Sequence, residues 1–220
     1  FYFQGSEIFP NIEQTPVWKM LLVMTVGFTL LPVPVSLDVR GWSEMHPLNG
    51  PAWSLFFEYV ANILYAVLIR KFTSRWLAVL VFLAGCALIH QCYTQGNNIG
   101  GWTLDAEQCR VGLTRLMFPF FGGLLLFRLC KPGRIRHGFW WCSLLLVGAL
   151  AAPHVGGAEN FRLNGLYDAF CIIVIFPAVI FLGASDIPGD ISARASRFLG
   201  NISYPLYITH YPIVYPVSYT

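Results

Sequence analysis

The sequence predicts an all-α protein, specifically a polytopic bundle of transmembrane helices. Of its 220 residues, 56% are hydrophobic and 11% are charged, and the mean hydropathy is +0.59. A soluble domain has about 25% charged residues. Apolar runs near the ~20 residues needed to cross ~30 Å of hydrocarbon alternate with short polar connectors. A membrane barrel would instead show shorter segments of alternating hydropathy, so the pattern favours helices.

Seven apolar runs are expected to span the membrane. The first has Lys19 near its start and ends in a kinked exit at Pro32 and Pro34, and the second begins after the turn residues Asn49, Gly50 and Pro51. The fifth run is the shortest. The predicted spans are residues 16–35, 52–69, 76–93, 111–130, 138–153, 166–183 and 198–215. The linker at residues 36–47 is mixed polar and aromatic, which predicts an ordered surface loop.

Lys and Arg residues are concentrated in alternate connectors. By the positive-inside rule these connectors, and with them the amino-terminal segment, are expected to be cytoplasmic in a cytoplasmic (inner) membrane. The linker and the loops at residues 94–110 and 154–164 then face outwards. This asymmetry accounts for the net charge of +3, so the expected partner is a lipid bilayer and not nucleic acid. The basic residues are Arg70, Lys71, Arg75, Arg128, Lys131, Arg134, Arg136, Arg194 and Arg197.

Four ionisable residues are predicted to lie within the outer half of the membrane. Helical rise places Glu58 roughly 9 Å and Arg115 about 6–7 Å from the outer surface, with Asp168 and His210 in the same layer. A charge at this depth costs at least ~2.5 kcal/mol, so it persists where it faces a bundle interior or water. We expect Glu58, Arg115 and His210 to share a polar cavity. Simple packing pairs, snorkelling side chains and a hydrogen-bonded packing histidine remain alternatives.

The residue types limit the chemistry of such a cavity. A His near a carboxylate can act as a general acid or base, and an Arg can hold an anion or stabilise an oxyanion. The His and Cys residues lack ligand spacing, so no metal site is expected. Cys92 and Cys109 flank an outer loop and form either a disulfide or two free thiols. The Gly122-Gly123 pair is expected to mark close helix packing.

Residues 49–58 (NGPAWSLFFE), 115–123 (RLMFPFFGG) and 199–210 (LGNISYPLYITH) together resemble the acyltransferase-3 family of bacterial multi-pass membrane O-acyltransferases. Residues 49–58 (NGPAWSLFFE) resemble its Trp-Ser/Thr-Leu-x-x-Glu signature, and residues 199–210 (LGNISYPLYITH) are similar to its Gly-x-x-Ser-Tyr-x-Leu-Tyr-x-x-His stretch. Residues 115–123 (RLMFPFFGG) resemble its Arg, Phe and Gly pattern at an outer helix entry. The resemblance implies about ten transmembrane helices and transfer of an acyl group, often acetyl from acetyl-CoA, to a hydroxyl of a carbohydrate or cell-envelope glycan.

The resemblance also implies roles for individual residues. Glu58 and His210 are the implied catalytic residues, and acyl-CoA is a donor substrate, with no permanently bound cofactor. The implied substrate-binding residues are Asn49, Trp53, Ser54, Arg115 and Tyr204. Family members carry an earlier helix with an Arg and then a catalytic His, which these residues lack. We therefore expect residues 1–220 to form one membrane-embedded domain of a longer protein.

Two other functions remain possible from the sequence. A small-molecule transporter also uses ionisable residues within the membrane, although it usually shows inverted repeats or broken helices in matching positions. A catalytically silent membrane scaffold is the second alternative, because the helix with the Arg and the His is absent. The sequence specifies neither the acceptor, nor the acyl chain length, nor the oligomeric state.

Overall fold

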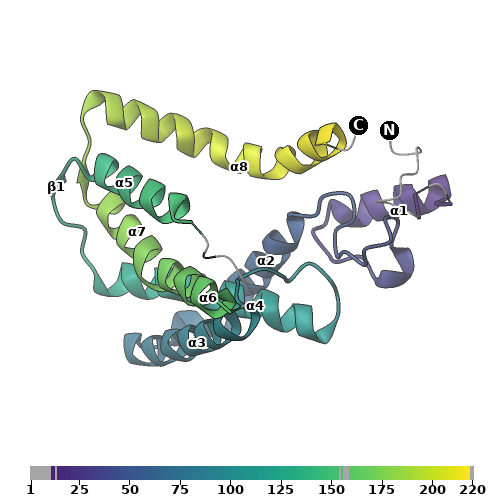
Figure 1. The fold of residues 1–220 in the computed structure, drawn as a ribbon, viewed down its shortest axis with the longest axis horizontal. Helices are drawn as coiled ribbons and strands as arrows, with labels where there is room; N and C mark the ends of the chain where they lie inside the picture. The colour runs from purple at the N-terminus through teal and green to yellow at the C-terminus, as the bar shows by residue number, and fades with distance from the viewer. Residues whose placement is uncertain (1–10, 13, 154, 156–158, 219–220) are drawn as a thin grey trace. The chain divides into compact units, whose positions relative to one another are not determined.

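The computed structural model describes residues 11–12, 14–153, 155 and 159–218, and of residues 212–218 it describes the backbone alone. Residues 154 and 156–158 of the last predicted outer loop lie outside this set. Helices supply almost all of the regular structure among the described residues (Figure 1). The α-helices are α1 (Val17–Gly27), α2 (Ala52–Val67), α3 (Ser74–Gln95), α4 (Ala106–Leu129), α5 (Gly138–Ala151), α6 (Phe161–Phe170), α7 (Phe176–Ala184) and α8 (Asp190–Ser218).

Among the residues that the structure describes, three helical stretches are long and apolar enough to cross a membrane, which confirms the predicted class of helical membrane bundle. They are α3, α4 and the stretch Phe161–Ala184, in which α6 and α7 are joined by a π-helical turn at Cys171–Ile175. Pro177 explains this turn, because proline has no N–H and its ring clashes with the carbonyl four residues earlier. α3 ends at Gly96, whose positive φ of 72° suits a residue without a side chain.

The predicted first span, residues 16–35, is wrong in its extent. α1 ends at Gly27, and Leu30 has a positive φ of 59°. The chain then turns back, and the Val33 N–H donates to the Met45 carbonyl at 2.8 Å. Two prolines follow in this segment and cannot donate to a helix, so the helical ladder is not continued.

The chain forms two compact units. The first contains the described residues up to Val60, together with Gly100–Leu113 and the described residues from Asn201 onwards. The second contains Ala61–Ile99 and Thr114–Gly200. Within the first unit, Val23 of α1 packs with Val33 and Val39, so the core lies between α1 and the linker that follows it.

In the second unit, α3 packs along α6 and α5 packs along α7 (Figure 1). Ala84, Leu88 and Cys92 of α3 form a buried cluster with Phe118 and Ala169. The backbones of α3 and α6 approach each other closely at Gly165, where an added Cβ would be 1.8 Å from the Cys92 carbonyl oxygen. The expected close packing at Gly122 and Gly123 is wrong, because a Cβ there would have no neighbour nearer than 3.8 Å.

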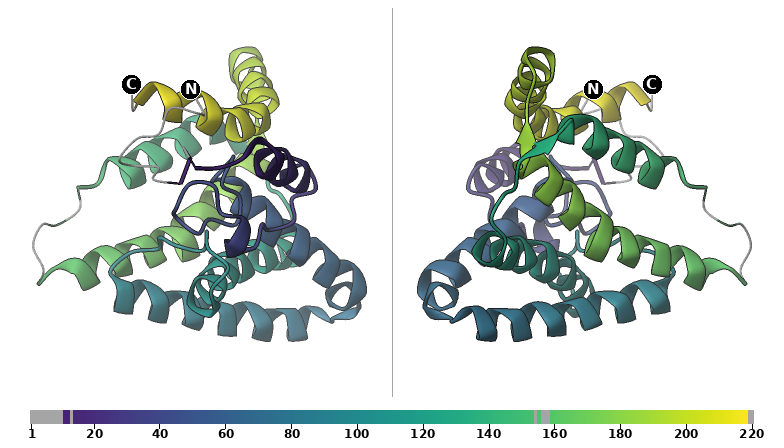
Figure 2. Two further views of the ribbon diagram at one scale, coloured as in Figure 1. Left: turned by 90° about the vertical axis from the view of Figure 1, so that its right-hand side faces the viewer. Right: turned by 90° about the vertical axis from the view of Figure 1, so that its left-hand side faces the viewer.

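The connectors that follow α4 and α7 are paired. The connector after α4 is basic, whereas Arg194 and Arg197, which were expected in the other connector, lie within α8. β1 (Ile135–Arg136) and β2 (Asp186–Ile187) form a two-stranded parallel ladder, visible as adjacent arrows in Figure 2. Asp186 Oδ1 accepts the N–H of Gly138 at 2.7 Å and so stabilises the beginning of α5. The helix that contains the last predicted span begins before residue 198, because the polar stretch from Asp190 is also helical. An acidic residue in a first helical turn is favourable to the helix dipole.

Candidate functional site

Two of the three motif segments are in direct contact, although about 150 residues separate them. The Tyr207 hydroxyl of α8 donates to the Pro51 carbonyl at 3.0 Å, and its oxygen lies 2.5 Å from Ser54 Oγ. Asn49 Nδ2 donates to the Ile208 carbonyl at 3.2 Å. The turn before α2 and α8 are therefore joined by polar contacts at Tyr207 and at the adjacent Ile208.

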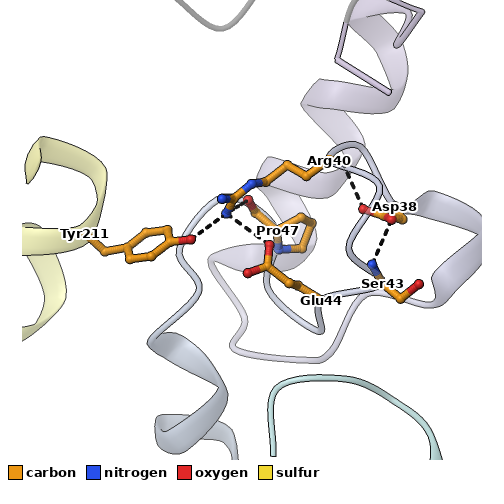
Figure 3. Close-up of polar contacts among 6 residues, drawn as sticks. All are labelled: Asp38, Arg40, Ser43, Glu44, Pro47 and Tyr211. Atoms are coloured by element: carbon orange, nitrogen blue, oxygen red, sulfur yellow. Dashed lines mark hydrogen bonds and ion pairs between the residues drawn. The ribbon is translucent and has the colours of Figure 1, made fainter. Parts of the chain in front are cut away.

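Tyr211 makes a second contact between the same segments, one turn further along α8. Its ring lies against Gly50, where an added Cβ would be 3.0 Å from Tyr211 Cζ. The Tyr211 hydroxyl accepts a hydrogen bond from Arg40 Nη1 at 2.8 Å (Figure 3). A residue without a side chain at position 50 is thus what allows the tyrosine ring to reach the linker.

Arg40 is the centre of a buried polar cluster, which we call the Arg40 cluster and define as Asp38, Arg40, Glu44 and Tyr211 (Figure 3). Only 4% of Arg40 is exposed. Its Nη1 also donates to the Pro47 carbonyl at 3.1 Å and lies 3.0 Å from Glu44 Oε2. The Glu44 contact is an ion pair by distance, without the angles of a hydrogen bond. Asp38 closes the turn by accepting the N–H groups of Arg40 and Ser43, each at 2.9 Å.

The linker is therefore ordered, as predicted, but its charged side chains are buried, and the prediction of a surface loop is wrong. Burial raises the pKa of Glu44 to about 7, with the nearby Asp38 adding to the rise and Arg40 opposing it. Burial lowers the pKa of His46, whose Nε2 lies 3.2 Å from the Leu30 carbonyl. Because that carbonyl can only accept, Nε2 carries the proton in the neutral imidazole.

His210 lies on α8 between the two tyrosines and is half-buried. Its Nδ1 is 2.7 Å from the Tyr207 carbonyl and 3.2 Å from the Leu206 carbonyl. Because a carbonyl oxygen only accepts, Nδ1 must donate, and the neutral ring then has its lone pair on Nε2. The helix backbone itself thus selects the tautomer whose basic nitrogen points away from the helix carbonyls.

The other predicted residues of the first unit lie close to this contact along the chain. Glu58 is exposed and lies one turn after Ser54 on α2, so it shares the helix face that contacts Tyr207. Tyr204 precedes Tyr207 by one turn and is 59% exposed. Trp53 is half-buried against Gly101, where an added Cβ would be 2.9 Å from its ring. Side chains one turn beyond the Ser54 and Tyr207 contact are therefore accessible.

Arg115 belongs to the second unit. There it is half-buried, and both Arg115 and Asp168 are near enough to the Cys92 thiol to interact with it electrostatically. Asp168 Oδ2 also accepts the N–H of Asn98 at 3.3 Å. Arg115 and Asp168 thus both lie near Cys92 of α3. A cavity shared by Arg115, Glu58 and His210 stays a prediction.

The cysteines and possible metal ligands can be placed as well. Cys92 and Cys109 are free thiols, so the open question of a disulfide is answered in favour of two thiols. In the part of the chain that the structure describes, no three His, Cys, Asp or Glu side chains are grouped to hold a metal ion. Sequence reasoning missed the contacts of Tyr207 and the Arg40 cluster. The signal for the Arg40 cluster was the density of charged residues immediately before the NGPAWS turn.

Comparison with known proteins identifies the family. A family model described as an acyltransferase domain matches residues 7–220, which is nearly the whole chain. Searches of curated proteins and of solved structures gave no match. The match includes all three motif segments, two of which the structure brings into contact. The chain belongs to the acyltransferase-3 family of membrane acyltransferases.

Proposed function

We propose that this membrane acyltransferase transfers an acyl group, acetyl in the first instance, from acyl-CoA to a hydroxyl of a carbohydrate or cell-envelope glycan. The single observation that carries the proposal is the hydrogen bond from His210 Nδ1 to the Tyr207 carbonyl. It leaves Nε2 as the basic nitrogen, which is what a general base for a hydroxyl nucleophile requires. The basic connectors are cytoplasmic in this proposal, and the membrane is the inner membrane.

The proposed step is a single acyl transfer. The acceptor hydroxyl oxygen forms a bond to the thioester carbonyl carbon while its proton passes to His210 Nε2. The carbon–sulfur bond breaks, and the proton leaves with the sulfur as the CoA thiol. No redox chemistry is involved, and the donor and acceptor are both substrates. An imidazole is suited to this transfer because the same nitrogen can accept and then release the proton.

The remaining residues receive supporting roles. Glu58 is exposed one turn after Ser54, on the α2 face that contacts α8, and in this proposal its carboxylate acts on the acceptor hydroxyl. Asn49 and Ser54 fix the turn against α8 through their hydrogen bonds to Ile208 and Tyr207. Tyr204 is exposed and available to a substrate. Arg115 holds an anionic group of a substrate in this proposal.

The experiment is an acyl-transfer assay on the full-length gene product in membranes. Radiolabelled acetyl-CoA is supplied, and label in the extracted glycan fraction is measured for the wild type, Glu58→Gln and His210→Gln. We expect each substitution to lower transfer by roughly 10²-fold or more, the usual contribution of a positioned general base. Membrane abundance is measured in parallel by immunoblot.

Matched controls are His90→Gln and Glu107→Gln, two exposed residues outside the proposed site. Both controls should retain wild-type transfer. Full activity of Glu58→Gln and His210→Gln at normal abundance would overturn the proposed site. Uptake of a small molecule into proteoliposomes, without covalent labelling of any glycan, would instead indicate a transporter.

A further inference from the structure

Arg40 makes an unusual number of contacts for a residue in a connecting loop. It is 4% exposed, and a single nitrogen, Nη1, reaches the Pro47 carbonyl, the Tyr211 hydroxyl and Glu44 (Figure 3). Its guanidinium carbon is 5.3 Å from the ring centroid of Trp42 and 5.4 Å from that of Tyr211. A buried charge is costly unless it is compensated, and the Glu44 carboxylate, when ionised, compensates Arg40.

We propose that Arg40 is a positioning residue for His210, acting through Tyr211. This inference rests on the proposed function, because it assigns His210 the role of base. Tyr211 is the next residue after His210, and the Arg40 hydrogen bond is a contact to α8 independent of those made by Asn49, Pro51 and Ser54.

Helical geometry explains how the two contacts orient His210. Tyr207 and Tyr211 are four residues apart and lie within about 40° of each other around α8, while His210 lies about 60° to the other side of Tyr207. The neighbouring contacts at Tyr207 and Ile208 leave the helix free to tilt about that one turn. A second contact one turn away fixes both the rotation and the axial position. The direction of the His210 ring is then set on each side by a tyrosine held to the turn before α2.

The contacts require arginine and not merely a positive charge. The guanidinium lies within cation–π distance of two aromatic rings while it donates hydrogen bonds. A lysine ammonium would preserve the charge opposite Glu44 but would lack the planar fork of donors that makes these contacts together. Arg40→Lys is therefore expected to fold with its charge balance intact while it loosens the contact to Tyr211. Tyr211→Phe keeps the ring against Gly50 and removes only the hydroxyl that accepts from Arg40.

The test compares Arg40→Lys, Tyr211→Phe and the double variant in the acyl-transfer assay on the full-length product. Misplacing a catalytic group by about 1 Å can cost roughly 10²-fold in rate. We expect each single variant to lower kcat by roughly tenfold or more, with KM for acetyl-CoA within about twofold of wild type. The double variant should be no slower than the slower single variant, because both remove the same connection.

Two measurements separate positioning from a general loss of structure. Membrane abundance and the melting temperature in detergent should stay close to wild type in Tyr211→Phe. The rate at which diethyl pyrocarbonate modifies His210, followed by mass spectrometry, should rise in both single variants. The matched controls are Arg134→Lys and Tyr59→Phe, exposed residues that should change neither kcat nor this rate.

The outcomes are distinct. Wild-type kcat in both single variants, or effects that multiply in the double variant, would overturn the positioning role. A change confined to KM would overturn it as well. If His210→Gln is fully active, the proposed function fails first. If His210→Gln is inactive and Tyr211→Phe is fully active, only the inference about Arg40 fails.

Discussion

Glu44 is a buried carboxylate of the linker, and its protonation makes the stability of the folded protein depend on pH. Its pKa is raised from 4.5 to about 7, chiefly by burial. Between these values the folded state holds a proton that the unfolded state has released, so the free energy of unfolding falls as pH rises through this range. This rise in pKa corresponds to a contribution of roughly 3 kcal/mol to the free energy of unfolding. The contribution is present in full below about pH 4.5 and is lost above about pH 7.

We predict that Glu44→Gln removes this dependence. Melting temperatures in detergent, measured from about pH 5 to about pH 8, should fall for the wild type relative to the variant as pH rises. The burial of His46 lowers its pKa, so His46 gives the opposite trend, with stability lost as pH falls through its range. His46 is present in both proteins, so its contribution cancels in the difference. Parallel melting curves for the two proteins would contradict the prediction.

Gly50 lies directly against the Tyr211 ring, so a side chain at this position would displace the tyrosine. In Gly50→Ala the new Cβ would meet the Tyr211 ring at 3.0 Å, so the ring must move by a few tenths of an ångström. The hydroxyl would then lose its hydrogen bond from Arg40. We expect a several-fold loss of kcat with little change in membrane abundance, measured by the acyl-transfer assay and immunoblot.

The control for Gly50 is Gly27→Ala at the end of α1, where an added Cβ would have no neighbour within 4 Å. This variant should retain wild-type kcat. Equal activity of both variants would show that the approach of Tyr211 to Gly50 does not matter for turnover.

At the level of elements, α3 and α6 depend on one close backbone contact. A Cβ on Gly165 would lie 1.8 Å from the Cys92 carbonyl oxygen, which is a helix backbone atom and cannot turn aside. We predict that Gly165→Ala forces the two helices apart and destabilises the protein by at least roughly 1–3 kcal/mol, the usual cost of overpacking. The measurement is the melting temperature in detergent, with membrane abundance as a second readout.

Gly123→Ala in α4 is the matched control for this element. An added Cβ there has no neighbour within 4 Å, and alanine in a helix interior is favoured over glycine by about 0.5–1 kcal/mol. The control should therefore be neutral or slightly stabilised. A Gly165→Ala protein that melts at the wild-type temperature would show that α3 and α6 are not packed this closely.

The long helices could be predicted from the sequence, and the linker could not. Apolar length alone gives α3, α4 and the stretch from α6 to α7, because crossing hydrocarbon requires it. Hydropathy does not reveal that Val33 pairs with Met45, which ends the first predicted span early. Nor does it reveal that Arg40 and Glu44 compensate each other, which is why charged residues in a loop can be buried.

The candidate site was predictable to a similar extent. The motifs identified Ser54 and His210, but hydrophobic patterns do not specify which side chains of two distant segments meet. Tyr207 and Tyr211 owe their importance to contacts with Pro51 and Arg40, which only the tertiary structure supplies. A tyrosine in an apolar helix is otherwise indistinguishable from a residue at the membrane interface.

For the whole molecule, the distribution of basic residues predicts which side of the membrane each connector faces. The connector that contains Arg134 is exposed and is paired with the one after α7, so both must lie on the same side. The first turn of α4, which contains Glu107, belongs to the loop predicted to face outwards. From the positive-inside rule we predict that Arg134 faces the cytoplasm and that Glu107 faces outwards.

This orientation is testable by labelling single introduced cysteines. We expect a membrane-impermeant maleimide to label Glu107→Cys on intact spheroplasts and Arg134→Cys only after the membrane is opened. The native cysteines give a background, so the wild type is labelled in parallel and its signal is subtracted. Both positions are exposed helix-end or connector residues, so neither substitution removes a buried contact. The reverse pattern would show that the protein has the opposite orientation in the membrane. The acyl-CoA of the proposed function would then have to reach a site near His210 from the opposite side.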